Sequence, residues 1–162
     1  MQPRTVTLRV LTPDEWPVFR EIRLEALRDA PAAFGSTLAD WQGERDTERR
    51  WRQRLTDVPF NAVAYVDGIL AGVVSATQPN ADGTELISMW VAPTERGTGV
   101  ADALVNAVVG FARKLRVATI SLDVMESNER ARAFYTRQEF IDRGRSDNGS
   151  EQRPERRMVR LV

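Results

Sequence analysis

Hydrophobic residues in this chain switch repeatedly between a two-residue and a three-to-four-residue period, and this switching constrains the fold more than any other feature. Two apolar, β-branched runs, 61–66 and 69–77, flank Asp67-Gly68, which is a strong signal for a β-hairpin. Over residues 101–115, by contrast, the apolar residues fall on one stripe of a helix. A chain with both kinds of segment buries its apolar surface by packing helices on a sheet.

The remaining segments predict the element order β-α-α-β-β-β-α-β-α-β-β. Residues 12–15, Thr-Pro-Asp-Glu, match a capping box, so a first helix begins there and ends before Pro31. A second helix is expected over roughly 44–55, and Ser127 or Asn128 can cap the last one. Strands are expected over 6–10, 61–66, 69–77, 84–91, 120–124, 140–141 and 157–162. Strand–helix–strand units give parallel pairs and hairpins give antiparallel ones, so we expect an α/β protein with a mixed sheet.

Two residue types that support many enzyme mechanisms are missing, since the chain has no cysteine and no histidine. This excludes disulfides, thiolate nucleophiles, Cys-ligated zinc, the Ser-His-Asp triad and the H-E-x-x-H metal site. We therefore expect no metal site. Catalysis must rely on carboxylates, Tyr, Ser, Thr, Arg, the single lysine Lys114, backbone groups or a bound cofactor.

The length and charge of the chain limit its organisation and its partners. Its 162 residues contain no internal repeat and no low-complexity linker, so we expect one domain over residues 1–162. The 23 basic and 23 acidic side chains cancel, which argues against a nucleic-acid partner. Residues 1–10 lack a signal-peptide core, and no stretch approaches the roughly 18 apolar residues of a membrane span, so we expect a cytoplasmic protein with no membrane partner.

The segment that carries chemistry runs from Glu85 to Phe140. A strand ends at Val91, and Arg-Gly-Thr-Gly at 96–99 then opens the long helix. Backbone N–H groups at a helix N-terminus are unpaired and attract anions, and glycines let a bulky pyrophosphate approach. The turn is not a P-loop, because Gly-Lys-Ser/Thr is missing, and no acidic residue follows at the distance that a dinucleotide-binding fold requires.

The wider pattern resembles the GCN5-related N-acetyltransferase (GNAT) superfamily. Residues 96–101 fit the Arg/Gln-x-x-Gly-x-Gly/Ala acetyl-CoA signature of that family, and Asn128, Ala131 and Tyr135 fit its second cofactor segment. One departure is visible, since Glu139 stands where the family commonly has Gly before an aromatic residue. The resemblance implies a mixed six- to seven-stranded central sheet flanked by about four helices.

The resemblance also implies a role for each matching residue. The strand end at Trp90 and Val91 would hydrogen-bond the pantetheine arm of acetyl-CoA, and Asn128 would contact its amides. Tyr135 would lie near the sulfur and give a proton to the departing thiolate, because its ordinary pKa near ~10 is close to that of a thiol. The residues that would hold the pyrophosphate through their backbone N–H groups, beside the Arg96 cation, are Gly97, Thr98, Gly99, Val100 and Ala101.

Glu85 is our first choice for the base that takes the amine proton, because it lies on the strand that leads to the pyrophosphate turn. Asp123 and Glu126 are reserves, and a water relay to solvent is the alternative. Five acidic and no basic residues lie between 57 and 95, whereas six arginines lie between 143 and 160. An acidic acceptor side would attract a cationic amine.

In this family the first two helices and their connection usually shape the acceptor pocket. Phe34, Ser36, Trp41 and Trp51 are therefore candidate wall residues, although a core position is the preferred interpretation for the two tryptophans. The features above predict an acetyl-CoA-dependent N-acetyltransferase that acts on the primary amine of a small molecule or amino-acid-like acceptor by direct attack. Acetylation of a protein or peptide and a non-catalytic acyl-CoA sensor stay open as alternatives. A homodimer is a further expectation, because dimers are common in the family.

Overall fold

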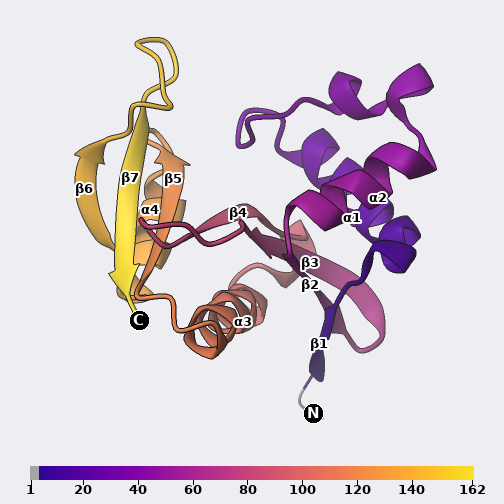
Figure 1. Cartoon of the computed structure of the whole chain (residues 1–162), viewed down its shortest axis with the longest axis horizontal. Helices are drawn as coiled ribbons and strands as arrows, with labels where there is room; N and C mark the ends of the chain where they lie inside the picture. Colours follow the sequence, from indigo (N-terminus) through magenta and orange to yellow (C-terminus); the bar gives the residue numbers. More distant parts are fainter. Residues whose placement is uncertain (1–3) are drawn as a thin grey trace.

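The computed structural model describes residues 4–162, and over this range seven strands form one sheet in the order β1-β2-β3-β4-β5-β7-β6 (Figure 1). The strands are β1 (Val6–Val10), β2 (Phe60–Val66), β3 (Ile69–Ala76), β4 (Thr84–Val91), β5 (Thr119–Met125), β6 (Ile141–Arg145) and β7 (Glu155–Leu161). The helices are α1 (Trp16–Asp29), α2 (Glu48–Asp57), α3 (Val100–Lys114) and α4 (Glu129–Arg137). β4 and β5 run parallel, and the other neighbouring strands pair antiparallel. The expected element order and mixed sheet are therefore confirmed.

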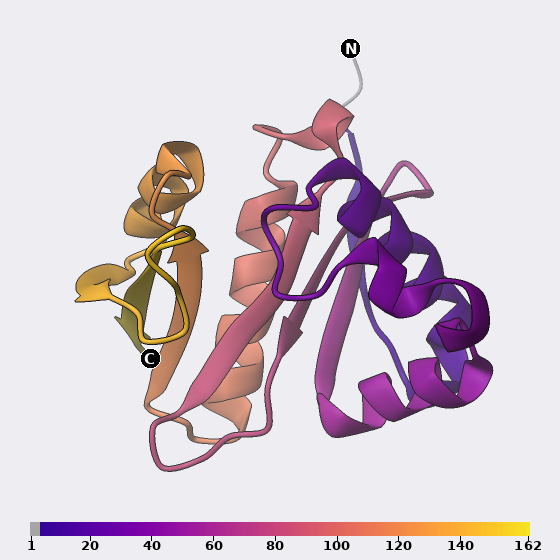
Figure 2. The ribbon, with the colours of Figure 1, turned by 90° about the horizontal axis from the view of Figure 1, so that it is seen from above.

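The β2–β3 hairpin forms at the predicted Asp67-Gly68 turn. Asp67 has φ of 50° and Gly68 has φ of 82°, and two left-handed residues are what a two-residue turn needs to match the strand twist. Both strands are buried over most of their length. Helices cover both of their faces, with α3 on one side and α1 and α2 on the other (Figure 2), so these strands read as continuous apolar runs in the sequence.

Two apolar clusters fix the helices to the two faces of the sheet. On one face α3 buries Leu104 and Val108 against β2–β5, and on the other α1 and α2 bury Phe19 and Trp51 against β2 and β3. Each of these four side chains is fully buried. Burial of one such side chain contributes roughly 1.5–3 kcal/mol, so the clusters hold the helices in a fixed position relative to β4.

A β-bulge interrupts β4 at Ser88, which has φ of 57°. Ile87 pairs with Ser75, but Trp90 pairs with Val73, so β4 contains one more residue than β3 over this interval. The extra residue reverses the alternation of side chains. As a result Trp90 packs with the α1–α2 cluster, whereas Leu86 lies in the α3 cluster.

The sheet opens between its two central strands. β4 and β5 are paired only through Thr84 with Ile120 and Glu85 with Ser121. Beyond Glu85 they separate, and the β5–β7–β6 group with α4 stands apart from β1–β4 (Figure 1). The β5-facing edge of β4 therefore leaves its backbone groups without a strand partner from residue 86 onward.

Several element boundaries differ from the expected ones. Residues 13–15 form a 3-10 turn with the expected capping box before α1. α2 begins at Glu48, because 43–45 form a separate turn and Thr47 caps the helix by accepting a hydrogen bond from the Arg50 N–H at 3.3 Å. The last two strands are longer than predicted, and Phe140 precedes β6 instead of belonging to it. Within residues 4–162, no helix has both the length and the apolar character needed to cross a membrane.

Candidate active site

The separation of β4 from β5 accommodates three adjoining hollows. One of about 510 Å³, the α3 cavity, lies beside the N-terminus of α3. A second of about 600 Å³, the β4–β5 cavity, lies where the two strands part. A junction of about 120 Å³ shares lining residues with both. Phe34, from the connection between α1 and α2, lines all three. Ligands in the two larger cavities would meet at the junction.

The turn before α3 leaves open space beside its backbone. Gly97 and Gly99 have φ of 78° and 93°, and a Cβ built on either would meet no atom within 4 Å. The first hydrogen bond of α3 runs from the Ala103 N–H to the Gly99 carbonyl at 3.1 Å, so the preceding N–H groups have no helical acceptor. An anion with a bulky substituent, such as a pyrophosphate, fits this turn through those N–H groups and the positive end of the helix dipole.

Asp29, at the end of α1, fixes the turn from the other side of the sheet. It accepts hydrogen bonds from the Trp90 Nε1–H at 2.9 Å and from Arg96 Nη2 at 2.7 Å. These bonds, with Trp90 the stronger influence, lower the pKa of Asp29 and keep it ionised. Arg96 also donates from Nε to the Val91 carbonyl at 3.0 Å. Its charge is therefore partly balanced by Asp29, so it holds the turn in shape as well as lining the cavity.

α4 places two further predicted residues at the junction. Asn128 caps the helix, since its Oδ1 accepts from the Ala131 N–H at 3.1 Å, and its Nδ2 donates to no other described residue. Tyr135 lies further along α4 and is only 8% exposed. Its ring centroid is 5.3 Å from that of Phe134 and 5.7 Å from that of Phe140. Burial raises the pKa of Tyr135, so its hydroxyl keeps its proton well above neutral pH.

Comparison with known proteins decides the family. A model of the acetyltransferase (GNAT) family matches residues 16–140. This chain belongs to that family. An uncharacterized N-acetyltransferase of Mycobacterium tuberculosis is 29% identical over 112 residues, which cover 68% of this chain and 71% of the relative. The PaiA N-acetyltransferase of Thermoplasma acidophilum, solved in complex with coenzyme A, is 16% identical over 98% of this chain and 99% of its own, with a TM-score of 0.74.

A third similar structure is a nourseothricin acetyltransferase, which is 29% identical and has a TM-score of 0.58, over 63% of this chain and 64% of its own. The GNAT resemblance seen in the sequence is thereby confirmed, as are the fold that it implied and the expectation of an N-acetyltransferase. Members of this family use acyl-CoA.

The GNAT cofactor residues expected from the sequence gather around the α3 cavity. Those that line it are Trp90, Val91, Arg96, Gly97, Gly99, Ala101 and Asn128. The two others, Thr98 and Val100, do not line it with their side chains. The Thr98 hydroxyl donates to the Glu95 carbonyl at 2.5 Å, and Val100, the first residue of α3, has a fully buried side chain. Both remain candidates only through their backbone N–H groups.

The three candidate bases of this GNAT protein have different surroundings. Glu85 lines the β4–β5 cavity at the point where the strands separate. Burial raises its pKa, the charge of Arg157 opposes this shift, and Asp123 and Glu155 add to it. Asp123 also lines the cavity, but it is paired with Arg157 Nε at 3.0 Å. Glu126 lines none of the three hollows.

Glu126 is bound instead by two arginines, Arg145 at 3.0 Å and Arg156 at 3.2 Å. The hydrogen bond from Arg145 is the main cause of its lowered pKa. A carboxylate held in this way is a poor proton acceptor. We therefore withdraw Glu126 as a reserve base.

Two of the four candidate wall residues line the β4–β5 cavity, and the other two pack against each other away from it. Phe34 and Ser36 line the β4–β5 cavity. Trp51 is fully buried, and Trp41 stacks on it with ring centroids 4.3 Å apart. The preferred core interpretation of the two tryptophans therefore agrees with their positions.

The acidic stretch between residues 57 and 95 contributes only one side chain to the β4–β5 cavity. Among the five acidic residues between 57 and 95, only Glu85 lines the β4–β5 cavity, and Asp67 and Glu95 pair instead with Arg4. Sequence neighbours on β-strands and turns point in different directions, so segregation of charge along the chain does not carry over to the cavity as a whole. The cavity wall on the α1–α2 side is in fact basic, since Arg23 and Arg54 line it.

Sequence reasoning missed both of these arginines. Arg23 lies four residues after Phe19 and four before Leu27, on the buried stripe of α1, and a charged residue on an apolar stripe was the available signal. Arg54 had no comparable signal, because α2 is rich in arginine and most of these side chains face solvent or ion-pair partners.

Proposed function

We propose that this GNAT protein transfers the acetyl group of acetyl-CoA to the primary amine of a small molecule, amino-acid-like compounds included. The observation that carries the proposal is the junction lined by Tyr135, where the α3 cavity and the β4–β5 cavity adjoin. One cavity has the open glycine turn that suits a pyrophosphate, and the other has a half-buried carboxylate, Glu85, suited to an amine.

The chain supplies three kinds of group for acetyl-CoA. Backbone N–H groups of the turn at 97–101 suit the pyrophosphate. The edge of β4 at Trp90 and Val91 has no strand partner and suits the amides of the pantetheine arm, although the Val91 carbonyl already accepts a hydrogen bond from Arg96. Asn128 Nδ2 adds a donor at the junction. When bound, acetyl-CoA supplies an activated acetyl group: a C–N bond to the amine forms, the C–S bond breaks, the amine loses one proton and the sulfur gains one.

The two proton transfers are assigned to Glu85 and Tyr135. The raised pKa of Glu85 makes it a stronger base than an ordinary carboxylate. Tyr135 holds a proton at the junction because burial raises its pKa. The same shift makes it a weaker acid than an exposed tyrosine, so it gives up this proton only to a strongly basic group such as the departing thiolate. Catalysis of this kind by positioned side chains contributes roughly 10²–10⁴-fold per group.

A small acceptor is favoured over a protein acceptor by the loops that bound the β4–β5 cavity. Arg153, from the loop before β7, donates from Nη2 to the Ala32 carbonyl at 2.5 Å, so this loop meets the connection that follows α1. A polypeptide entering the cavity along this side would have to part the two loops. The sensor alternative is disfavoured because the full set of expected residues is present and lines the α3 cavity, namely Arg96, Gly97, Gly99, Asn128 and Tyr135.

Acceptor-dependent thiol release tests the proposal. The chain has no cysteine, so a thiol reagent reports only the coenzyme. The wild-type protein should release thiol from acetyl-CoA when amines are supplied, and Gly99→Trp should abolish release by filling the turn. Gly110→Trp is the matched control, since Gly110 lies exposed on the same helix with no atom near its Cβ position. Equal rates for the wild-type protein and Gly99→Trp, or no release with any amine, would reject the proposal.

A further inference from the structure

The basic wall of the β4–β5 cavity contains two guanidinium groups that no carboxylate balances. Arg23 is 7% exposed, forms no ion pair within residues 4–162, and its Nη1 is buried without a hydrogen-bond partner. Its guanidinium carbon lies 4.7 Å from the centre of the Phe34 ring. Burying a charge in this way costs free energy unless a partner is supplied.

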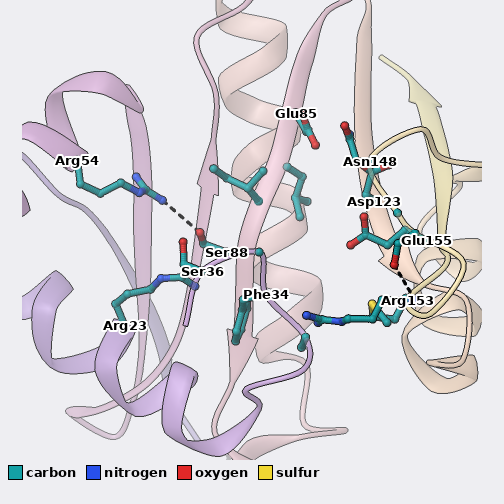
Figure 3. A pocket seen from close by; sticks show the side chains of 17 residues that line it. Arg23, Phe34, Ser36, Arg54, Glu85, Ser88, Asp123, Asn148, Arg153 and Glu155 are labelled. Atoms are coloured by element: carbon teal, nitrogen blue, oxygen red, sulfur yellow. Dashed lines mark hydrogen bonds between the residues drawn. The ribbon is translucent and has the colours of Figure 1, made fainter. Parts of the chain in front are cut away.

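Arg54 lies beside Arg23 and is satisfied only by neutral oxygens. It donates from Nη1 to Asn61 Oδ1 at 3.0 Å and from Nη2 to the hydroxyls of Ser75 and Ser88, both at 3.2 Å. The Ser88 bond links Arg54 to the bulge of β4, and Figure 3 shows it as a dashed line. Arg54 forms no ion pair within the described part of the chain either, although the charge of Asp57 acts to raise its pKa.

The two arginines remain charged at neutral pH but are destabilised in that state. Burial lowers the pKa of Arg23 to about 10. Burial also lowers the pKa of Arg54 to about 10, and repulsion from Arg23 adds to the effect. Two adjacent, desolvated cations facing a cavity are an arrangement that an entering anion would relieve.

The opposite wall of the same cavity is acidic. Glu85 on β4, Asp123 on β5 and Glu155 on β7 line it, and Figure 3 shows Asp123 and Glu155 across the cavity from Arg23 and Arg54. Arg157 balances Asp123 at 3.0 Å, whereas Glu85 and Glu155 form no ion pair within residues 4–162. A third arginine, Arg153, points into the space between the walls while bound to the Ala32 carbonyl. A ligand that spans the cavity therefore meets cations at one end and carboxylates at the other.

We infer that the acceptor carries an oxyanion on the same small molecule as its amine, with a carboxylate held by Arg23 and Arg54 and the amine directed toward Glu85. This inference rests on the proposed function and specifies its substrate class. The guanidinium group presents paired N–H donors that match a carboxylate, and charge-assisted bonds of this kind are stronger than neutral ones. An aminophosphonate presents the same chemistry, so both anions belong in the test.

The test compares acceptors that differ only in the anionic group. Each standard amino acid is assayed by thiol release beside its carboxamide, its decarboxylated amine and, where one exists, its aminophosphonate. For the best acceptor, the carboxylate form should have a kcat/KM at least about tenfold higher than the carboxamide and the decarboxylated amine. Faster turnover of the phosphonate than of the carboxylate would overturn the assignment of a carboxylate.

Arg23→Met separates binding from folding. Because Arg23 forms no hydrogen bond with another described residue, the variant should unfold at a temperature no lower than that of the wild-type protein. Its KM for the carboxylate acceptor should rise at least about tenfold, with little change for the decarboxylated amine. Arg28→Met is the matched control, since Arg28 is exposed on the same helix and lines none of the hollows. Arg23→Lys keeps the charge but loses the paired donors, so its KM for the carboxylate acceptor should fall between those of the wild-type protein and Arg23→Met. This variant replaces Arg23→Met in the test if Arg23→Met does not fold.

The outcomes separate this inference from the function on which it rests. Equal kcat/KM for the amino acid and its decarboxylated amine would overturn the inference and leave the acetyltransferase proposal intact. The same would follow if the Arg23 variants weakened both acceptors alike. Binding of acetyl-CoA without acetylation of any amino acid would also overturn the inference. Failure to bind acetyl-CoA at all would instead reject the proposed function.

Discussion

Replacement of Tyr135 by Phe removes one hydroxyl from the junction and little else. The ring stays between Phe134 and Phe140, and the hydroxyl forms no hydrogen bond with another described residue. The free energy of unfolding should therefore change by less than about 1 kcal/mol, because no intramolecular hydrogen bond is lost. If Tyr135 gives the proton to the departing sulfur, kcat should fall about 10²–10⁴-fold. The dissociation constant of acetyl-CoA should stay nearly unchanged.

The assay is initial-rate thiol release with the best amine acceptor, combined with calorimetric titration of acetyl-CoA. Tyr65→Phe is the matched control, because Tyr65 is the other tyrosine of the chain and packs with the α1–α2 cluster on β2. Burial raises the pKa of Tyr135, so its ionisation should not limit the wild-type rate at mildly alkaline pH. An unchanged kcat in Tyr135→Phe would remove Tyr135 from the mechanism. A loss of thermal stability that accounts for the lost rate would do the same.

Three further substitutions test the base and the fold. Glu85→Gln should lower kcat/KM about 10²–10⁴-fold and abolish the acidic limb of the pH–rate profile. In the wild-type protein this limb should lie above the ordinary carboxyl range, because the pKa of Glu85 is raised and the base acts only when ionised. An unaltered profile would favour a water relay. Glu139→Gly should stabilise the protein by roughly 0.5 kcal/mol, or about 1–2 °C in Tm, because it relieves a φ of 68° at a non-glycine residue. The substitution loses the ion pair between the exposed Glu139 carboxylate and the largely buried Arg160. A lower Tm would show that this pair outweighs the backbone strain. Gly83→Ala should lower the free energy of unfolding in urea by at least about 2 kcal/mol, since Gly83 has φ of 106° and a Cβ there would lie 2.1 Å from the Thr119 carbonyl oxygen. A urea midpoint equal to that of the wild-type protein would mean that this turn adjusts freely.

Local signals account for the parts of the fold that the sequence predicted. The Asp67-Gly68 turn, the capping box at 12–15 and the cap at Asn128 each act over a few residues, and all three appear in the structure. The glycine turn before α3 is equally local, because positive φ at Gly97 and Gly99 needs no tertiary partner. Glu139 adopts the left-handed conformation that the family usually assigns to glycine, so the backbone turn is kept although the residue differs.

Features that depend on long-range contacts were not predictable in this way. The bulge at Ser88 decides which face Trp90 occupies, and a strand pattern read with strict alternation gives no sign of it. Asp29 is separated from Arg96 by 67 residues, yet it fixes that side chain. The distribution of charge around the β4–β5 cavity depends on how α1, α2 and β7 meet, so the basic wall formed by Arg23 and Arg54 could not be predicted from charges counted along the chain.

The central claim is that the α3 cavity binds acetyl-CoA, and direct titration tests it most simply. Calorimetry of the purified wild-type protein with acetyl-CoA, and in parallel with NADH, compares two pyrophosphate-containing ligands that differ in the pantetheine arm. We predict saturable binding of acetyl-CoA in the micromolar range, no binding of NADH, and loss of acetyl-CoA binding in Gly99→Trp but not in Gly110→Trp. The absence of binding by acetyl-CoA, or equal binding of both ligands, would contradict the account.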